Sequence, residues 1–180
     1  DEVWLKDLAT DAERQLTFIG SSAGSVAPDG LRVAVGRLVG NRGAIDSYDS
    51  SGSGEPMRLC DDCALSGGAW SADGSRLLIT RKRHALDRSV FLDVASKHEV
   101  EVTSHAAWNI FQSRLSPDGR WVVFHTSNAP NLRQVHAVRA SPEASAPARE
   151  WVDVATDFGI FPDWSPDGTR FVATAAHGAG

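Results

Sequence analysis

The 180-residue chain has only two cysteines, one methionine and one tyrosine, and it contains no long apolar run. No stretch approaches the roughly 18 consecutive apolar residues that a membrane-spanning helix needs. The sequence also lacks the His-Glu-x-x-His pattern that would place two histidines on one zinc ion. We therefore expect no membrane span, no metal centre and no cofactor, and the sequence marks no catalytic group.

The charge balance is mildly acidic. Eighteen lysines and arginines face 23 aspartates and glutamates, so the net charge is -5 at neutral pH. Binding to nucleic acid or to anionic lipid generally needs a basic surface, so we expect neither partner. The apolar and charged fractions, 42% and 23%, are those of an ordinary globular protein that can bury a core in one domain.

A short turn pattern recurs four times along the chain. The copies are Ala27-Pro28-Asp29-Gly30, Ser71-Ala72-Asp73-Gly74, Ser116-Pro117-Asp118-Gly119 and Ser165-Pro166-Asp167-Gly168. In such a turn proline fixes the first corner, aspartate bonds the nearby backbone, and glycine supplies the positive φ that returns the chain to a strand. We therefore assign these Asp and Gly residues a structural role in four hairpins.

Each turn leads into an apolar triplet, at 33–35, 77–79, 122–124 and 171–173. Short apolar runs bounded by turn signals are typical of buried strands. A second hairpin pattern follows the first in each unit, and no long stretch has apolar residues at helical spacing. Four strands in about 45 residues are typical of one β-propeller blade. The predicted fold class is all-β, a propeller of four-stranded antiparallel blades.

We expect one propeller domain over 1–180, with three complete blades at 21–60, 65–104 and 108–156. The segment 2–18 matches the outer half of a blade, and 161–176 matches the inner half. Either these halves pair and close a small four-bladed ring, or they belong to a larger ring that further sequence or a second copy completes. The second alternative is favoured, because the chain opens at Asp1 in mid-pattern and 175–180 looks like a cut end. The connection 140–149 is expected to be a mobile surface loop.

The fourth copy carries a family resemblance. Trp164-Ser165-Pro166-Asp167-Gly168, followed by two residues and an apolar triplet, resembles the PD40 repeat of TolB-like, WD40-like propellers. The resemblance covers almost the whole chain and departs at Val26-Ala27, which lacks Trp-Ser, and at Ala72, which replaces proline. It implies a non-catalytic bacterial propeller, often exported to the periplasm, that docks proteins or ligands. Similar repeats also occur beside kinase domains and as lids of prolyl-oligopeptidase-like enzymes.

The two cysteines stand in Cys60-Asp61-Asp62-Cys63 at the end of a predicted strand. A local disulfide, two free thiols, and a metal or redox pair are the alternatives. A redox pair should open a helix, whose N-terminus lowers the thiol pKa, whereas the two aspartates here would raise it. A zinc site needs four ligands, and no second Cys pair exists. The disulfide is favoured.

Two other patterns resemble functional motifs. Gly20-Ser21-Ser22-Ala23-Gly24 matches the Gly-x-Ser-x-Gly nucleophile elbow, which requires a following helix. Because this copy lies between two predicted strands, we interpret it as a flexible loop between blades. The four repeated turn aspartates are predicted to lie on different blades, so they cannot supply the six or more clustered oxygens that calcium takes.

The predicted binding surface consists of loops on one face, at 36–43, 60–68, 81–88, 105–110 and 125–133. Arg81, Arg83 and His84 form a basic cluster in the loop between the second and third strands of a blade. A solvated loop is the simpler interpretation of that cluster, and contact with an acidic partner is the alternative. Trp70 and Trp164 share one repeat position and are expected to pack between blades.

The innermost strands are expected to line a central channel. Trp108 and Asn109 precede such a strand and Trp108 is placed at the channel mouth, while Gln112 and Arg114 are the polar candidates within it. The sequence thus favours a binding scaffold whose partner is another protein or domain, or a second copy that completes a ring. The alternatives are the propeller domain of a larger enzyme, such as a peptidase or a receptor-type kinase, and a polysaccharide-binding or lyase propeller.

Overall fold

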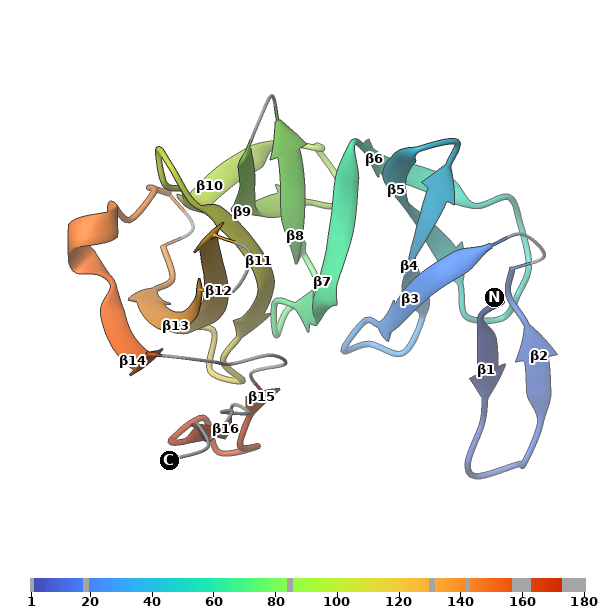
Figure 1. The fold of residues 1–180 in the computed structure, drawn as a ribbon. Coiled ribbons are helices and arrows are strands. Elements are labelled where there is room, and N and C mark those ends of the chain that lie inside the picture. Colours follow the sequence, from blue (N-terminus) through green and yellow to red (C-terminus); the bar gives the residue numbers. More distant parts are fainter. Residues whose placement is uncertain are drawn as a thin grey trace, which may run out of the picture.

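The structure is a computed structural model that describes residues 2–17, 20–83, 86–129, 132–141, 143–156 and 163–172. These residues form strands, with one three-residue 3-10 helix at Ala148–Glu150. They assemble three four-stranded antiparallel sheets and two two-stranded sheets (Figure 1). The predicted all-β class, built of four-stranded antiparallel blades, is confirmed.

Each four-stranded sheet is one blade, with its strands in chain order. Blade 1 contains β3 (Ser21–Val26), β4 (Arg32–Val39), β5 (Arg42–Asp49) and β6 (Met57–Asp61). Blade 2 contains β7 (Cys63–Trp70), β8 (Arg76–Arg83), β9 (Leu86–Asp93) and β10 (Glu99–Thr103). Blade 3 contains β11 (Asn109–Leu115), β12 (Trp121–Ala129), β13 (Leu132–Arg139) and β14 (Val152–Thr156).

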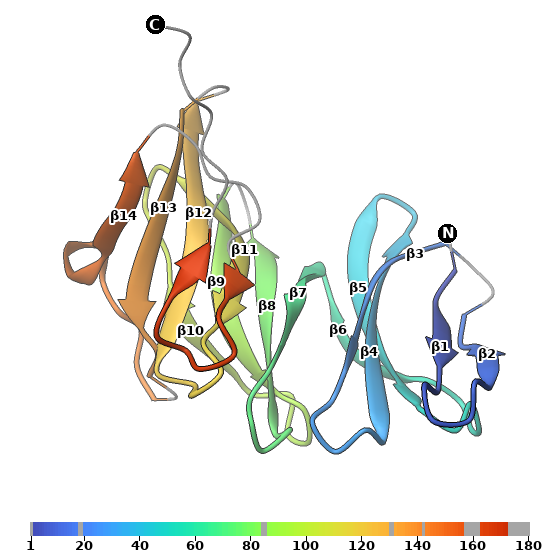
Figure 2. The ribbon, with the colours of Figure 1, turned by 90° about the horizontal axis from the view of Figure 1, so that it is seen from below.

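The blades stand side by side in an open arc (Figures 1 and 2). Their first strands β3, β7 and β11 neighbour one another along the inner side. The N-terminal hairpin, β1 (Trp4–Lys6) with β2 (Glu13–Gln15), flanks blade 1. The C-terminal hairpin, β15 (Asp163–Trp164) with β16 (Phe171–Val172), lies at the other end, next to β11. The two half-blades are therefore separate sheets, not one closed fourth blade.

The apolar triplets explain why the blades stack. Successive side chains of a strand point to opposite faces of its sheet. In β8 the first and third residues of the triplet, Leu77 and Ile79, pack into the core between blades 1 and 2. The middle residue, Leu78, packs into the core between blades 2 and 3. All three side chains are fully buried. The run is continuously apolar because both faces of the blade are covered by neighbours.

The repeated turns also bind neighbouring blades together. In every copy the glycine has positive φ, and its N–H donates to the carbonyl of the residue three positions earlier at 2.8–2.9 Å. Arg32 of the first turn donates to the Gly74 carbonyl of the second at 3.0 Å. Trp70 reaches back to the Ser25 carbonyl at 3.2 Å, so this indole packs between blades as predicted. We call this end of the blades the turn edge.

Two expected loops are in fact ordered by packing. The segment 60–68 was predicted as a loop, but β6 ends at Asp61 and β7 begins at Cys63. The whole crossing between blades is Asp62, which adopts φ +52°. The connection 140–149 was predicted to be a mobile surface loop, yet Ala146 is buried and its N–H donates to the Val102 carbonyl of blade 2 at 2.9 Å. Backbone bonding to β10 holds this connection in place.

Candidate functional site

The ends of the blades opposite the turn edge form a continuous rim. We define this hairpin rim as residues 38–42, 61–63 and 104–108 with the adjoining ends of β8, β9 and β11. The Lys82 N–H donates to the Asp62 carbonyl at 3.0 Å, which joins blades 1 and 2. The Asp87 N–H donates to Asn109 Oδ1 at 2.9 Å, which joins blades 2 and 3. The predicted binding residue Asn109 thus lies on the rim and links two blades.

The basic cluster does not lie in a loop, and that prediction is wrong. Arg81 and Arg83 belong to β8, where they pair with Arg88 and Leu86 of β9. The Arg81 guanidinium forms an ion pair with Glu99 and also bonds the Asp61 carbonyl. The positive charge of Arg81 is therefore paired within the protein. His84 lies outside the described residues.

Trp108 lies over the outer half of blade 3, so its placement at the channel mouth is wrong. Its ring stacks on His105 with the centroids 4.3 Å apart, and it lies 6.3 Å from both Trp151 and His136. His136 stands on β13, and Trp151 directly precedes β14. The cluster continues inward, because Trp151 meets Phe124 edge to face at 4.9 Å.

A polar relay with a buried hydroxyl, a buried imidazole and an exposed carboxylate adjoins these aromatic rings. Thr126 Oγ1 lies 3.0 Å from His136 Nε2, and Asp153 Oδ1 lies 2.9 Å from His136 Nδ1. Burial lowers the pKa of His136, and the bond to Asp153 opposes that shift. The order resembles a hydroxyl–imidazole–carboxylate triad. However, Thr126 is only 2% exposed, so its hydroxyl cannot meet a substrate, and we interpret the relay as a clamp across β12, β13 and β14.

The two polar candidates on the inner strand β11 stand at a bulge. Gln112 has φ +52°, and the pairing of β11 with β12 shifts register between Phe111 and Arg114. Arg114 is half-buried, and its carbonyl accepts the Trp164 indole N–H at 3.2 Å. Burial lowers the pKa of the Arg114 guanidinium, while Asp163 acts in the opposite direction. Arg114 therefore joins blade 3 to the C-terminal half-blade.

Cys60 and Cys63 form a disulfide across the single-residue crossing between β6 and β7. Cys63 is fully buried and Cys60 nearly so. The nucleophile-elbow pattern was interpreted as a loop, but its residues 21–24 belong to β3, so that interpretation is wrong; Ser21 is buried and its hydroxyl donates to Thr17 Oγ1 at 2.9 Å. Strand β3 leads to β4, not to a helix, so the pattern has no elbow geometry.

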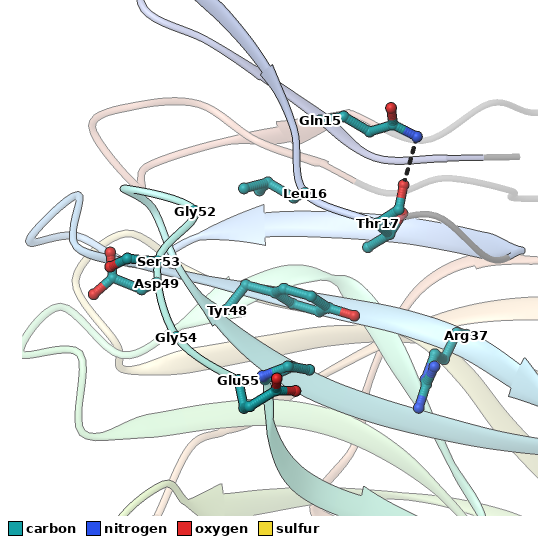
Figure 3. Close-up of a pocket in the computed structure, with 11 residues that line it drawn as sticks. Gln15, Leu16, Thr17, Arg37, Tyr48, Asp49, Gly52, Ser53, Gly54 and Glu55 are labelled. Atoms are coloured by element: carbon teal, nitrogen blue, oxygen red, sulfur yellow. Dashed lines mark hydrogen bonds between the residues drawn. The ribbon is translucent and has the colours of Figure 1, made fainter.

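A pocket of about 480 Å³ lies between the N-terminal half-blade and blade 1 (Figure 3). It is lined by Gln15, Leu16, Thr17, Arg37, Tyr48, Asp49 and the segment 52–56. Sequence reasoning missed this pocket, because its walls come from three separated segments that carry no common motif.

Arg37, which lines the pocket, belongs to an ion-pair network around Asp46. Asp46 is 2% exposed; its Oδ2 lies 2.6 Å from Arg37 Nε, and its Oδ1 is bonded by Arg58. Burial and, secondarily, the charge of Asp46 raise the pKa of Tyr48, so its phenol stays protonated at neutral pH. Arg37 is thus paired with a buried carboxylate, and Tyr48 adds a neutral hydroxyl donor to the same pocket lining.

Within the described residues, no group of three or more histidine, cysteine, aspartate or glutamate side chains is arranged to hold a metal ion. In the same part of the chain, no helix has the length and apolarity needed to cross a bilayer.

The geometry defines a class: stacked four-stranded blades, each with an Asp-Gly turn between its first two strands, are a β-propeller array. Among solved structures, TolB from Acinetobacter baumannii superimposes with a TM-score of 0.77 at 19% identity, over 98% of this chain and 43% of that one. A structure assigned as TolB from Agrobacterium tumefaciens gives 0.69 at 21% identity, over 94% and 61%. The fold is therefore that of the TolB-type propeller, as the repeats indicate.

Enzyme propellers share the same architecture. A structure from a study of two prolyl endopeptidases superimposes with a TM-score of 0.64 at 11% identity, over 91% of this chain and 27% of that one. No family model matches the sequence, and no curated protein matches it either. The chain spans about half the length of the TolB proteins that it resembles. At these identities the likeness establishes the fold alone.

Proposed function

We propose that this chain is a non-catalytic scaffold that binds another protein or domain through its hairpin rim. The observation that carries the proposal is the exposure of two successive aliphatic side chains at the end of β4, one on each face of the blade: Leu38 is 67% exposed and Val39 is 48% exposed. Large aliphatic side chains exposed together on a rigid support are typical of interaction sites. The TolB-type fold supports the same function, because its blades hold this rim in a fixed shape.

The charges of the rim suit a polar border around that apolar pair. Arg42 lies 3.4 Å from Asp62, and both side chains remain largely in solvent. An apolar centre with a charged border is the usual anatomy of a protein interface. The rim is also braced by the bonds from Lys82 and Asp87, so little ordering is required when a partner binds.

Site-specific photo-crosslinking in the source organism tests the proposal. A crosslinker at position 38 should capture a defined protein, and the purified partner should bind the chain at least about tenfold more weakly after Leu38→Asp, because a charge would enter the apolar contact. The matched control is position 31, where Leu31 is 64% exposed on the turn edge. Equal capture from both positions, or unchanged affinity of Leu38→Asp, would contradict the proposal.

A second candidate is the propeller domain of a larger enzyme, which the likeness to the prolyl endopeptidase structure favours. The complete open reading frame distinguishes the two, since a peptidase or kinase domain beside these blades would assign the rim to contact within one chain. Light scattering of the purified chain tests a homotypic version, in which two copies complete a ring. A stable dimer supports that version and a folded monomer contradicts it.

We also propose an extracytoplasmic location, which the Cys60–Cys63 disulfide supports, because disulfides persist in oxidising compartments. Rapid alkylation of intact cells followed by mass spectrometry tests it. Both cysteines should escape alkylation until a reductant is added, and alkylation without reductant would contradict the location.

A further inference from the structure

We propose that the pocket between the N-terminal half-blade and blade 1 binds a small organic carboxylate. This site is distinct from the hairpin rim, so the inference does not depend on the scaffold function. Its walls are the end of β2, the strands β4 and β5, and the segment 52–56 (Figure 3). A volume of about 480 Å³ falls in the range of small-ligand sites.

The donors for a carboxylate come from the neighbouring strands β4 and β5. Arg37 Nε lies 2.6 Å from Oδ2 of the buried Asp46, in an ion pair that does not satisfy either atom as a hydrogen bond. The two terminal nitrogens of Arg37 have no protein partner among the described residues. The phenol of Tyr48 likewise has none, and Figure 3 shows its hydroxyl on the side of the ring toward Arg37. A guanidinium beside a hydroxyl forms charge-assisted hydrogen bonds with a carboxylate.

The rest of the lining selects a ligand with a single negative charge and an apolar body. Leu16 is 5% exposed and belongs to the apolar cluster against which Tyr48 packs, so these side chains offer a surface to a ring or a short aliphatic group. Asp49 is charged at neutral pH, because hydrogen bonds from Ser51 lower its pKa. With Glu55 on the same wall, a ligand of higher negative charge would be repelled.

Glycines shape the outer wall of the pocket. Gly52 and Gly54 have φ of +72° and +81°, which lets the segment turn sharply at both positions. The Arg14 side chain bonds the Ser51 carbonyl and so ties this segment to β2. The outer wall is thus fastened to the half-blade on one side and to β5 on the other.

Benzoate is a suitable probe, and benzamide is its uncharged match. Titration of the isotope-labelled chain should give saturable NMR shifts with benzoate at amides of 15–17, 48 and 52–55. Benzamide should bind at least about tenfold more weakly, because it lacks the charge that Arg37 recognises. Equal binding of the two compounds would overturn the proposal, as would shifts that map elsewhere or never saturate.

Two conservative variants separate ligand contact from folding. Tyr48→Phe keeps the ring and removes only the hydroxyl, and should weaken benzoate about fivefold. Arg37→Lys keeps a positive charge beside Asp46 but loses the planar fork, and should weaken it about tenfold. The control is Arg149→Lys, an exposed arginine in the 3-10 helix before β14, which should leave the affinity unchanged. Unchanged benzoate affinity in both pocket variants, with wild-type unfolding curves, would overturn the site.

Discussion

Each turn aspartate holds its turn together through hydrogen bonds that its carboxylate accepts from neighbouring turn residues. Asp73 accepts bonds from the Ser71 hydroxyl at 2.5 Å, from the Ser75 N–H at 3.0 Å and from the Ser75 hydroxyl. These bonds, that of Ser71 foremost, lower the pKa of Asp73 to about 2. Ser116 and Arg120 do the same for Asp118, whose pKa is also about 2. The carboxylates therefore stabilise the turns only in their ionised form.

Acid should weaken the fold through these turns. A carboxyl whose folded pKa lies below its unfolded value, 3.8, contributes stability above that value and loses it as the pH falls toward 2. The double variant Asp73→Asn/Asp118→Asn should be less stable than wild type at neutral pH and should lose less stability between pH 4 and 2. Urea unfolding across that window measures it, with Glu143→Gln as the control. Parallel pH curves would contradict the turn role.

Gly43 stands where a β-carbon has no room. A Cβ at this position of β5 would lie 2.2 Å from the Cys63 carbonyl oxygen, which belongs to the backbone of the next blade. Gly43→Ala should therefore lower the free energy of unfolding by about 1–3 kcal/mol, as overpacking does. Gly20→Ala is the control, since nothing lies within 4 Å of its Cβ position, and it should change stability by less than about 0.5 kcal/mol.

At the scale of elements, a proline of one turn lies close to the glycine of the next. A Cβ on Gly74 would lie 3.8 Å from Pro28 Cδ, and one on Gly168 would lie 3.6 Å from Pro117 Cδ. In the second copy Ala72 replaces proline, and nothing in the described chain lies within 4 Å of the same point on Gly119. The junction of blades 2 and 3 therefore lacks a contact that two other junctions have.

Restoring that proline should stabilise the protein. The second turn has the same glycine-to-carbonyl bond as the proline-containing copies, so its backbone is compatible with Ala72→Pro. We expect a gain of about 0.4–1 kcal/mol, mainly from a less flexible unfolded chain. Guanidinium unfolding measures the gain, and Pro28→Ala should show a loss of similar size. If Ala72→Pro is destabilising, the turns are not equivalent.

The disulfide fixes the shortest crossing in the fold. Cys60 and Cys63 bracket Asp62, the single residue between β6 and β7. Closing so small a loop should contribute about 2 kcal/mol. Reductant should therefore lower the urea midpoint of the wild type and leave that of Cys60→Ala/Cys63→Ala unchanged. A wild-type midpoint that ignores reductant would mean that packing alone holds the crossing.

The repeat made the elements predictable, whereas the contacts between elements were not. Asp-Gly turns and apolar triplets act locally, so they fixed the blades and the class of fold from the sequence. The placement of Trp108 depends on its contacts with His136 and Trp151, and the docking of 140–149 depends on bonds to β10; both join segments that are distant in the sequence. The pocket at Arg37 likewise arises only when β2 meets blade 1.

At the scale of the whole molecule, successive blades stack in the same way, but different side chains join them at each junction. Blades 1 and 2 are joined by the Trp70 indole on Ser25. The third copy has Leu115 in place of that tryptophan, so blades 2 and 3 use other groups. Trp151 donates to Thr103 Oγ1 at 2.8 Å, and the Thr103 hydroxyl donates to the Ala146 carbonyl at 2.8 Å. The long connection of blade 3 thus replaces the missing repeat contacts.

The alternating triplets have a consequence for the order in which the protein opens. No blade encloses a core of its own, since Leu77 and Leu78 of one strand serve different neighbours. The stability of such a stack is the sum of the interfaces between neighbouring blades, and local unfolding begins at the two ends of the stack. Amide hydrogens of β8 and β9 should therefore exchange slowest. Exchange should become faster outward through β4 and β12 and be fastest in the two half-blades, because the stack opens from its ends.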